Sequence, residues 1–247
     1  MIDRFAYTAM TGAKHAAGQL TTTTHNLANA QTLGFREMLS AYRATPIQGA
    51  SADSRAFVVD STAGFNGTPG TLQQTGNPLD IALVQDGYFA VQVEGGGEAY
   101  TRQGRFNVDV EGYLISLNGQ RAISSKDDEI YVGNGNKSVY FGSDGGVFVQ
   151  GTDGEHKQVS QLKVVNPAAR ELVHRPDGLF EVAGQWHEHV EGVPMQAGAV
   201  ESSNVNVAKA MVEMIQQNRM FELNMRMVQV AEQNARSAQS LFSLSRV

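Results

Sequence analysis

The hydrophobic positions at the start of the chain follow a helical pattern. Small apolar side chains recur in alternating steps of four and three, which places them on one side of a helix. These positions are Ile2, Ala6, Ala9, Ala13, Ala16, Leu20, Thr23 and Leu27. The pattern predicts an N-terminal helical arm over residues 1–44, with Gly34 as its stop. Because alanine buries little area and the run Thr21–Thr24 is β-branched, this helix is expected to be weak on its own.

The end of the chain carries a stronger apolar stripe. Apolar residues recur every seven positions, which predicts a C-terminal helical arm over residues 204–247. They are Val207, Met214, Phe221, Val228, Ala235 and Phe242, with Met211, Asn218 and Met225 at the alternate positions until Ala231 takes over. Each stripe could pack on the chain's own β domain. The matching spacing at opposite chain ends favours pairing of the two arms with each other and with neighbouring subunits.

The middle of the chain predicts antiparallel β structure. All six prolines and 23 of the 26 glycines lie between residues 45 and 203. Asn-Gly and Asp-Gly pairs, which favour hairpin turns, separate short alternating runs such as Tyr88–Val93. We therefore expect a linker over residues 45–65 and a β-rich central domain over residues 66–203. The predicted fold class is a mainly β central domain flanked by long N- and C-terminal α-helices.

Composition narrows the possible functions. Cysteine is absent, which excludes disulfides and thiolate chemistry. The net charge of −6 divides into +2 in each arm and −10 in the middle, so no basic face for nucleic acid emerges. No apolar stretch is long enough to cross a membrane, and the first residues lack the pattern of a conventional cleaved signal peptide.

Candidate chemistry is sparse. His187 and His189 flank Glu188 and could hold a metal, but a third ligand is not placed and a solvated strand edge is the favoured interpretation. The segment 133–138 resembles the end of a phosphate loop, but its spacing fits a turn better. We predict no catalytic residue, cofactor or metal, and expect a part of an assembly rather than an enzyme.

Two terminal motifs and three central ones resemble those of the bacterial flagellar rod and hook family. The N-terminal motif, residues 25–36, contains Asn26, Leu27, Asn29, Gly34 and Phe35, and the C-terminal motif contains Asn204, Arg219 and Glu222. The central motifs are Gly76–Leu83, Asp86–Phe89 and Tyr100–Gly104. The short length and the segments Tyr7–Ala13 and Arg43–Pro46 are most similar to the proximal-rod member of that family.

The resemblance implies a structural subunit of the basal-body rod, the shaft that transmits torque from motor to hook. It implies that the terminal helices pair as a coiled coil in the assembled filament, through the apolar positions given above. It also implies partners among other rod and basal-body proteins and further copies of the chain. Export would use the flagellar type III apparatus, without a cleaved signal peptide and without membrane insertion, and would end in the periplasmic rod.

Alternative functions remain open at this stage. A distal-rod or hook-type member of the same family would carry the same motifs. A secreted β-rich adhesin or binding module would normally need a cleavable signal, and a β-rich enzyme would need a convergent polar pocket. Neither feature is visible in the sequence.

Overall fold

The chain forms two compact units. The computed structural model describes residues 2–46, 56–93, 95–134, 138–151, 154–168, 171–175, 177–182 and 187–244, with the backbone alone described for 2–5, 41–46, 56–63 and 238–244. The helical unit consists of Met1–Ala30, Glu37–Asn66 and Val205–Val247. The β unit consists of Gln31–Arg36 and Gly67–Asn204. Neither unit is continuous in sequence.

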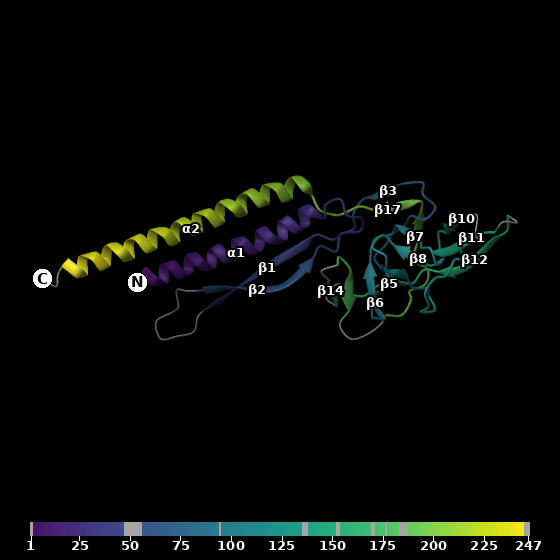
Figure 1. Ribbon diagram of the computed structural model, residues 1–247, viewed down its shortest axis with the longest axis horizontal. Helices are drawn as coiled ribbons and strands as arrows, with labels where there is room; N and C mark the ends of the chain where they lie inside the picture. The colour runs from purple at the N-terminus through teal and green to yellow at the C-terminus, as the bar shows by residue number, and fades with distance from the viewer. Residues whose placement is uncertain are drawn as a thin grey trace. The chain divides into compact units, whose positions relative to one another are not determined.

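The helical unit contains two helices and a β-hairpin. Helix α1 spans Ile2–Ala28 and helix α2 spans Val207–Leu244. They lie side by side and antiparallel, so that both chain termini are at the same end of the pair (Figure 1). Strands β1 (Met38–Pro46) and β2 (Ala56–Phe65) pair antiparallel, with an irregularity between Leu39 and Ala41.

The flanking helices agree with the sequence analysis, but the predicted fold class is wrong in how it uses them. The predicted fold class placed the helix pair in a coiled coil of an assembled filament, although the matching spacing also favoured pairing of the two arms with each other. In the structure, α1 and α2 pair within a single chain and share their unit with the β1–β2 hairpin. The N-terminal arm is also not helical throughout, because the helix ends at Ala28 and strand β1 begins at Met38. The segment 45–65, expected to be a linker, contains the end of β1 and all of β2.

The β unit contains fifteen strands in the described residues, arranged in four small sheets. The largest has the order β14-β15-β6-β5-β9-β8-β7, with β13 paired to β5. Its strands are β5 (Tyr88–Val93), β6 (Gly97–Thr101), β7 (Phe106–Val108), β8 (Leu114–Ser116), β9 (Arg121–Ala122), β13 (Val164–Val165), β14 (Leu172–His174) and β15 (Phe180–Val182).

Three smaller sheets complete the unit. A three-stranded sheet has the order β10-β11-β12, and two pairs join β16 to β4 and β17 to β3. These strands are β3 (Leu72–Gln74), β4 (Ile81–Leu83), β10 (Ser138–Phe141), β11 (Gly146–Gln150), β12 (His156–Gln161), β16 (Met195–Ala197) and β17 (Ala199–Glu201). All the pairings between strands are antiparallel.

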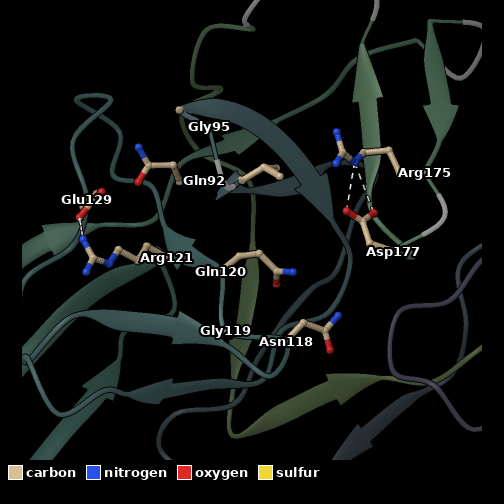
Figure 2. A pocket seen from close by; sticks show the side chains of 11 residues that line it. Gln92, Gly95, Asn118, Gly119, Gln120, Arg121, Glu129, Arg175 and Asp177 are labelled. Atoms are coloured by element: carbon tan, nitrogen blue, oxygen red, sulfur yellow. Dashed lines mark hydrogen bonds and ion pairs between the residues drawn. The ribbon is translucent and has the colours of Figure 1, made fainter.

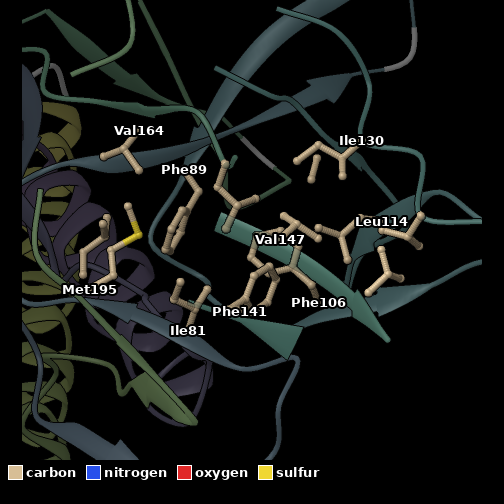
Figure 3. Packing of buried hydrophobic residues seen from close by; sticks show 14 residues of the cluster. Ile81, Phe89, Phe106, Leu114, Ile130, Phe141, Val147, Val164 and Met195 are labelled. Atoms are coloured by element: carbon tan, nitrogen blue, oxygen red, sulfur yellow. The ribbon is translucent and has the colours of Figure 1, made fainter. Parts of the chain in front are cut away.

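A hydrophobic core holds these sheets together. Figure 3 shows aromatic and aliphatic side chains from different sheets converging on one cluster. Phe106 packs edge-to-face against both Phe89 and Phe141, with ring centroids 5.8 and 5.6 Å apart. Such buried aromatic pairs contribute beyond their area alone. The core therefore joins β5, β7 and β10, which belong to two different sheets.

The predicted turn residues fall into two groups. Asn118-Gly119, Asp144-Gly145 and Asp177-Gly178 connect adjacent paired strands, as expected for hairpins. Asp86-Gly87 instead joins β4 to β5, which do not pair with each other. Asp153 and Gly135 lie outside the described residues, so two further predicted turns are only partly described.

Candidate functional site

The apolar positions predicted on α1 face α2. Ala9, Ala13 and Ala16 are buried, and so is Thr23 further along the same side. Ala6, Leu20 and Leu27 are half-buried. The side chain of Ile2 lies outside the described residues. The heptad pattern of α1 thus marks the side that contacts its partner helix within the chain.

On α2, one half of the predicted stripe faces α1 and the other half does not. Met214, Phe221, Val228 and Ala235 are half-buried, as the seven-residue spacing suggests. The alternate positions are Ala210, Asn224 and Ala231, which are buried, instead of the predicted Met211 and Met225, which are 47% and 39% exposed. Val207 is 40% exposed, and the side chain of Phe242 lies outside the described residues. Up to Val228 the buried alternate positions are therefore one residue earlier than predicted, whereas Ala231 is buried as predicted.

The α2 helix carries exposed apolar side chains on several sides. At about 100° per residue, Val212, Leu223 and Val230 lie on one side of the helix, about 100–160° around it from Ala210 and Asn224. Exposed apolar residues also flank the contact with α1, and the full set is Val207, Met211, Val212, Ile215, Met220, Leu223, Met225, Met227 and Val230. Groups of exposed apolar side chains usually mark surfaces that contact other protein or membrane. Among the described residues, no helix is both long and apolar enough to span a membrane.

The threonine run of α1 is accommodated by local hydrogen bonds. The hydroxyls of Thr21, Thr22 and Thr24 each donate to the carbonyl oxygen four residues earlier, at 3.0, 3.3 and 2.7 Å. Each hydroxyl is thereby satisfied within the helix, although such bonds compete with the helical backbone. The run is therefore compatible with the helix that the sequence analysis expected it to weaken.

The asparagines of the N-terminal motif organise the end of α1. The side chain of Asn26 is buried and binds the backbone of Met38 at the start of β1. Asn29 donates through both its backbone and its side chain to the carbonyl of His25, at 3.1 and 3.0 Å. The two bonds of Asn29 both end on the His25 carbonyl, in the last turn of α1, where carbonyl groups begin to lack intrahelical partners. The motif therefore sets where the helix stops and the hairpin begins.

A buried ion cluster lies in the β unit, where three separate segments of chain meet. Glu201 is almost fully buried between two buried arginines. Its Oε1 atom is 2.9 Å from Nη1 of Arg36, and its Oε2 atom is 2.6 Å from Nη2 of Arg102. The backbone N–H of Gly70 also donates to Oε1, at 2.8 Å. One carboxylate thus connects residues 31–36, residues 67–71 and the residue that follows β6. We call Arg36, Arg102 and Glu201 the attachment cluster.

Backbone contacts reinforce the attachment cluster. The N–H of Gly34 donates to the carbonyl of Glu201 at 2.8 Å, and the amide of Asn204 donates to the carbonyl of Thr68 at 2.8 Å. Gly34 has φ of +68°, and a Cβ atom there would lie 2.4 Å from the carbonyl carbon of Arg102. A side chain is therefore excluded on two grounds, close approach and backbone conformation. Phe35 beside it is buried.

Burial and charge act against each other in this cluster. Desolvation lowers the pKa of Arg36, and the Glu201 carboxylate partly offsets that effect. Two cations around one anion leave a net positive charge. Arg102 also donates hydrogen bonds to the carbonyl oxygens of Gln85 and Gly87, at 2.8 and 2.7 Å, and these oxygens stabilise that charge. The cluster is fully hydrogen-bonded on the carboxylate, as a buried charge requires.

The central motifs build further buried polar contacts. Asp80, with no exposed surface, accepts hydrogen bonds from Arg105 at 3.1 and 3.0 Å, from Thr75 at 2.7 Å and from Asn77 at 3.0 Å. A Cβ atom on Gly104 would lie 1.6 Å from the carbonyl oxygen of Ile81. The residues that resemble a family signature in the centre of the chain therefore hold strands together.

A third buried charge in the β unit is that of Lys163. The ammonium of Lys163 is 3.0 Å from Oε1 of Glu98 and 2.6 Å from Oδ1 of Asp127. Desolvation by burial raises the pKa of Glu98, although its hydrogen bond with Lys163 acts in the opposite direction. Asp127 has φ of +67° and bonds back to Ser124 within a tight turn. This cluster joins β6 to two loops.

One polar pocket of about 690 Å³ opens among the turns of the β unit. Figure 2 shows that its two arginines already engage carboxylates, Arg121 with Glu129 at 2.6 Å and Arg175 with Asp177 at 3.1 Å. Arg121 also pairs with Glu111. The pocket is charge-balanced, and its charged groups serve to fix the surrounding turns.

The histidines considered as metal ligands have other contacts. Nδ1 of His189 accepts a hydrogen bond from the N–H of Val164 at 3.1 Å, and the N–H of His187 donates to the hydroxyl of Tyr100 at 3.3 Å. Residues 187–190 do not form the strand that the sequence analysis assumed. In the part of the chain that the structure describes, no three potential metal ligands gather.

The remaining motif residues lie at the surface. Arg219 and Glu222 are exposed on α2. No role was predicted for Arg36, Arg102, Glu201 or Lys163. Their buried charges are the main polar feature of the β unit. Arg102 lies in the central motif Tyr100–Gly104, whereas its partner Glu201 lies outside the motifs. Glu201 is 99 residues away in sequence, and only the fold brings the pair together.

Comparisons with known proteins agree with the family resemblance of the sequence motifs. A family model described as "Flagellar basal body rod FlgEFG protein C-terminal" matches residues 196–241, and one described as "Flagellar hook protein FlgE/F/G D1 domain" matches residues 82–149. The chain is 36% identical to the flagellar basal-body rod protein FlgF of Escherichia coli strain K12, with 99% of this chain and 100% of that protein covered. It is 35% identical to FlgF of Salmonella typhimurium, with the same coverage. It is 27% identical to the flagellar basal-body rod protein FlgG of Bacillus subtilis, over 93% of this chain and 96% of that protein.

Proposed function

Because the chain belongs to the flagellar basal-body rod protein family, we propose that it is a structural subunit of the proximal part of the rod and helps transmit torque from motor to hook. The observation that carries this proposal is the match to FlgF relatives along the whole chain. Identity to the two FlgF relatives is higher than to the FlgG relative, which favours the proximal position over the distal one.

The surface of the helical unit supports a role in assembly. Helix α2 uses one side to contact α1, yet exposes apolar side chains on its other sides. Contact with neighbouring subunits would remove these side chains from water, at roughly 25 cal/mol for each Å² of apolar surface. Contacts between different surfaces of identical subunits do not close on themselves and build helical tubes. Further copies of this chain and other rod proteins are the neighbours that fit this surface.

The proposed role is structural rather than catalytic, and it includes delivery to the basal body. We propose export through the flagellar type III apparatus without cleavage of a signal peptide, followed by assembly in the periplasmic rod. Mass spectrometry of the protein in purified basal bodies would test whether a signal peptide is cleaved. The peptide at the start of the chain should begin at Met1 or Ile2, and an internal start would contradict uncleaved export.

A charge placed on the outer side of α2 tests the assembly role. Leu223 is 51% exposed, so Leu223→Asp should leave the folded monomer intact. Burial of the new carboxylate against a neighbour would cost several kcal/mol, so incorporation into basal bodies should fall by about tenfold or more. Incorporation is measured by quantitative immunoblotting of isolated basal bodies, and motility is scored on soft agar.

Gln216→Asp is the matched control, because Gln216 is already polar and exposed on the same helix. It should incorporate close to the wild-type level. Normal incorporation of Leu223→Asp would contradict an intersubunit role for this side of α2. A large drop in the melting temperature of its monomer would instead place Leu223 in the chain's own core.

A further inference from the structure

Asn224 is a buried polar residue in the contact of α2 with α1, and the half-buried Gln217 lies one heptad before it. The side chain of Asn224 is 9% exposed, whereas the other buried residues on the described part of α2 are Ala210 and Ala231. The amide nitrogen donates to the carbonyl of Met220 at 2.8 Å, which fixes the orientation of the side chain. Burial of an amide in a helix contact is costly, so its presence there calls for a compensating role.

The residue opposite Asn224 is a glycine. A Cβ atom on Gly12 would lie 2.7 Å from Oδ1 and 3.0 Å from Cγ of Asn224. Real Cβ atoms do not approach other atoms so closely, so any residue larger than glycine would displace the amide. Gly12 costs helix stability by roughly 1 kcal/mol relative to alanine. The amide and the missing side chain therefore fit each other in size.

The antiparallel arrangement extends this contact into a set of layers. Because the two helices are antiparallel (Figure 1), a heptad step of three or four residues along α1 is matched by a step of four or three residues in the opposite direction along α2. This places Ala9 against Val228 and Ala16 against Phe221, so small residues of α1 face larger ones of α2. A shift of one heptad would bring Gln19 or Phe5 to the position of Gly12. Either side chain would collide with Asn224.

We propose that Gly12 and Asn224 form a lock that selects the face of α2 and the register at which α1 binds. Apolar burial alone does not make that selection, because α2 is apolar on several sides. A single buried polar residue is known to fix the register of paired helices at some cost in stability. Held by its hydrogen bond to Met220, the Asn224 amide disfavours a helix that lacks a glycine opposite it, and so favours one face of α2 for α1.

The absence of cysteine allows a direct test in the full-length protein. Ala9→Cys with Val228→Cys reports the observed register, and Ala9→Cys with Ala235→Cys reports a shift of one heptad. Each pair is oxidised in dilute solution, and the intrachain disulfide is quantified by peptide mass spectrometry. With the lock intact, the first pair should form at least about tenfold more disulfide than the second.

Three changes to the lock are then compared in both reporters. Asn224→Leu should lower the ratio of the two disulfides by about tenfold, because leucine tolerates other registers. Gly12→Ala should lower it as well, and adding Asn224→Ala should not restore it, because the double variant has room for the methyl group but no amide to select the register. Met225→Leu, at an exposed position beside Asn224, should leave it unchanged.

The ratio distinguishes a lock from a general contribution to stability. A purely stabilising role would alter the helical circular dichroism signal while leaving the preferred register the same. An unchanged ratio in Asn224→Leu would overturn the proposal. Recovery of the wild-type ratio in the Gly12→Ala, Asn224→Ala variant would also overturn it, because the register would then not depend on the amide.

Discussion

Asn26 and Met38 exchange two hydrogen bonds in the manner of paired strand residues. The side-chain amide of Asn26 donates to the carbonyl of Met38 at 2.9 Å, and the N–H of Met38 donates to Oδ1 of Asn26 at 2.8 Å. A side chain near the end of α1 therefore acts as a backbone partner for the first residue of β1. The primary amide is needed for this, because it offers one donor and one acceptor side by side.

Replacement of Asn26 should weaken the helical unit. Asn26→Asp keeps the acceptor but sets a carboxylate against the carbonyl of Met38, and Asn26→Ala leaves both backbone groups unpaired. Each should lower the free energy of unfolding by about 1–3 kcal/mol. Urea titration followed by far-ultraviolet circular dichroism measures the change. Asn218→Asp, at an exposed position of α2, should have a much smaller effect.

Neutralising Glu201 should destabilise the β unit severely. Glu201→Gln leaves Arg36 and Arg102 buried without an anion, a change that costs about 3–5 kcal/mol when a buried ion pair is broken. Calorimetric melting of the purified protein would show it as a marked loss of melting temperature. The exposed Glu155→Gln serves as control. A melting temperature equal to wild type would mean that the attachment cluster contributes little.

A methyl group at Gly104 should prevent normal packing of the β unit. The Cβ atom would overlap the carbonyl oxygen of Ile81, which belongs to β4 and has little freedom to move. Gly104→Ala should therefore reduce soluble yield or melting temperature strongly, as overpacking and strain do. Gly67→Ala meets no atom within 4 Å and should behave like wild type. Equal melting temperatures for the two variants would contradict the close approach of these segments.

Alkaline pH should destabilise the protein in part through Tyr88. Burial raises the pKa of the Tyr88 phenol above its ordinary value of 10.0, although Arg36 and Arg102 act to lower it. The folded state thus holds this proton more tightly than the unfolded state. Its contribution to stability is complete below the ordinary pKa and is lost as pH rises through the folded pKa.

Tyr88→Phe keeps the edge-to-face contact with Phe180 but removes the ionisation. The slope of unfolding free energy against pH above about pH 10 should become shallower in this variant. Some slope should remain, because the pKa of Lys163 also lies above its ordinary value: desolvation lowers it, but hydrogen bonds to Asp127 and Glu98 outweigh that effect. Urea titrations at several alkaline pH values measure the slope. An identical slope in both proteins would show that ionisation of Tyr88 does not contribute to the loss of stability at alkaline pH.

The sequence predicted the fold where local patterns decide it. Heptad spacing located α1 and one half of the α2 contact, and Asn118-Gly119 and Asp144-Gly145 marked real hairpins. The alternate positions of α2 were wrong because Met211 and Met225 are more hydrophobic than Ala210 and Asn224. The structure buries the smaller residues, since the partner helix approaches closely at Gly12. Hydrophobicity alone therefore misjudged which side of α2 is covered by α1.

The hairpin and the buried charges could not be predicted in the same way. Residues 45–65 contain proline, glycine and small polar residues typical of a linker, and the strand conformation of the described parts, Thr45–Pro46 and Ala56–Phe65, depends on pairing between β1 and β2. Glu201 and Arg102 become partners only through contacts between distant segments. Sequence patterns report periodicity within an element, whereas such pairs depend on the arrangement of many elements.

The discontinuous make-up of the helical unit has a consequence for the order of folding. Its three segments include residues 205–247, so α1 has no partner helix until nearly the whole chain has been synthesised. An Ala-rich helix of this kind is marginal without its partner. The N-terminal segment should thus stay pliable on the ribosome and during any passage through a narrow channel. Completion of the unit would then be among the last steps of maturation, timed by arrival of α2.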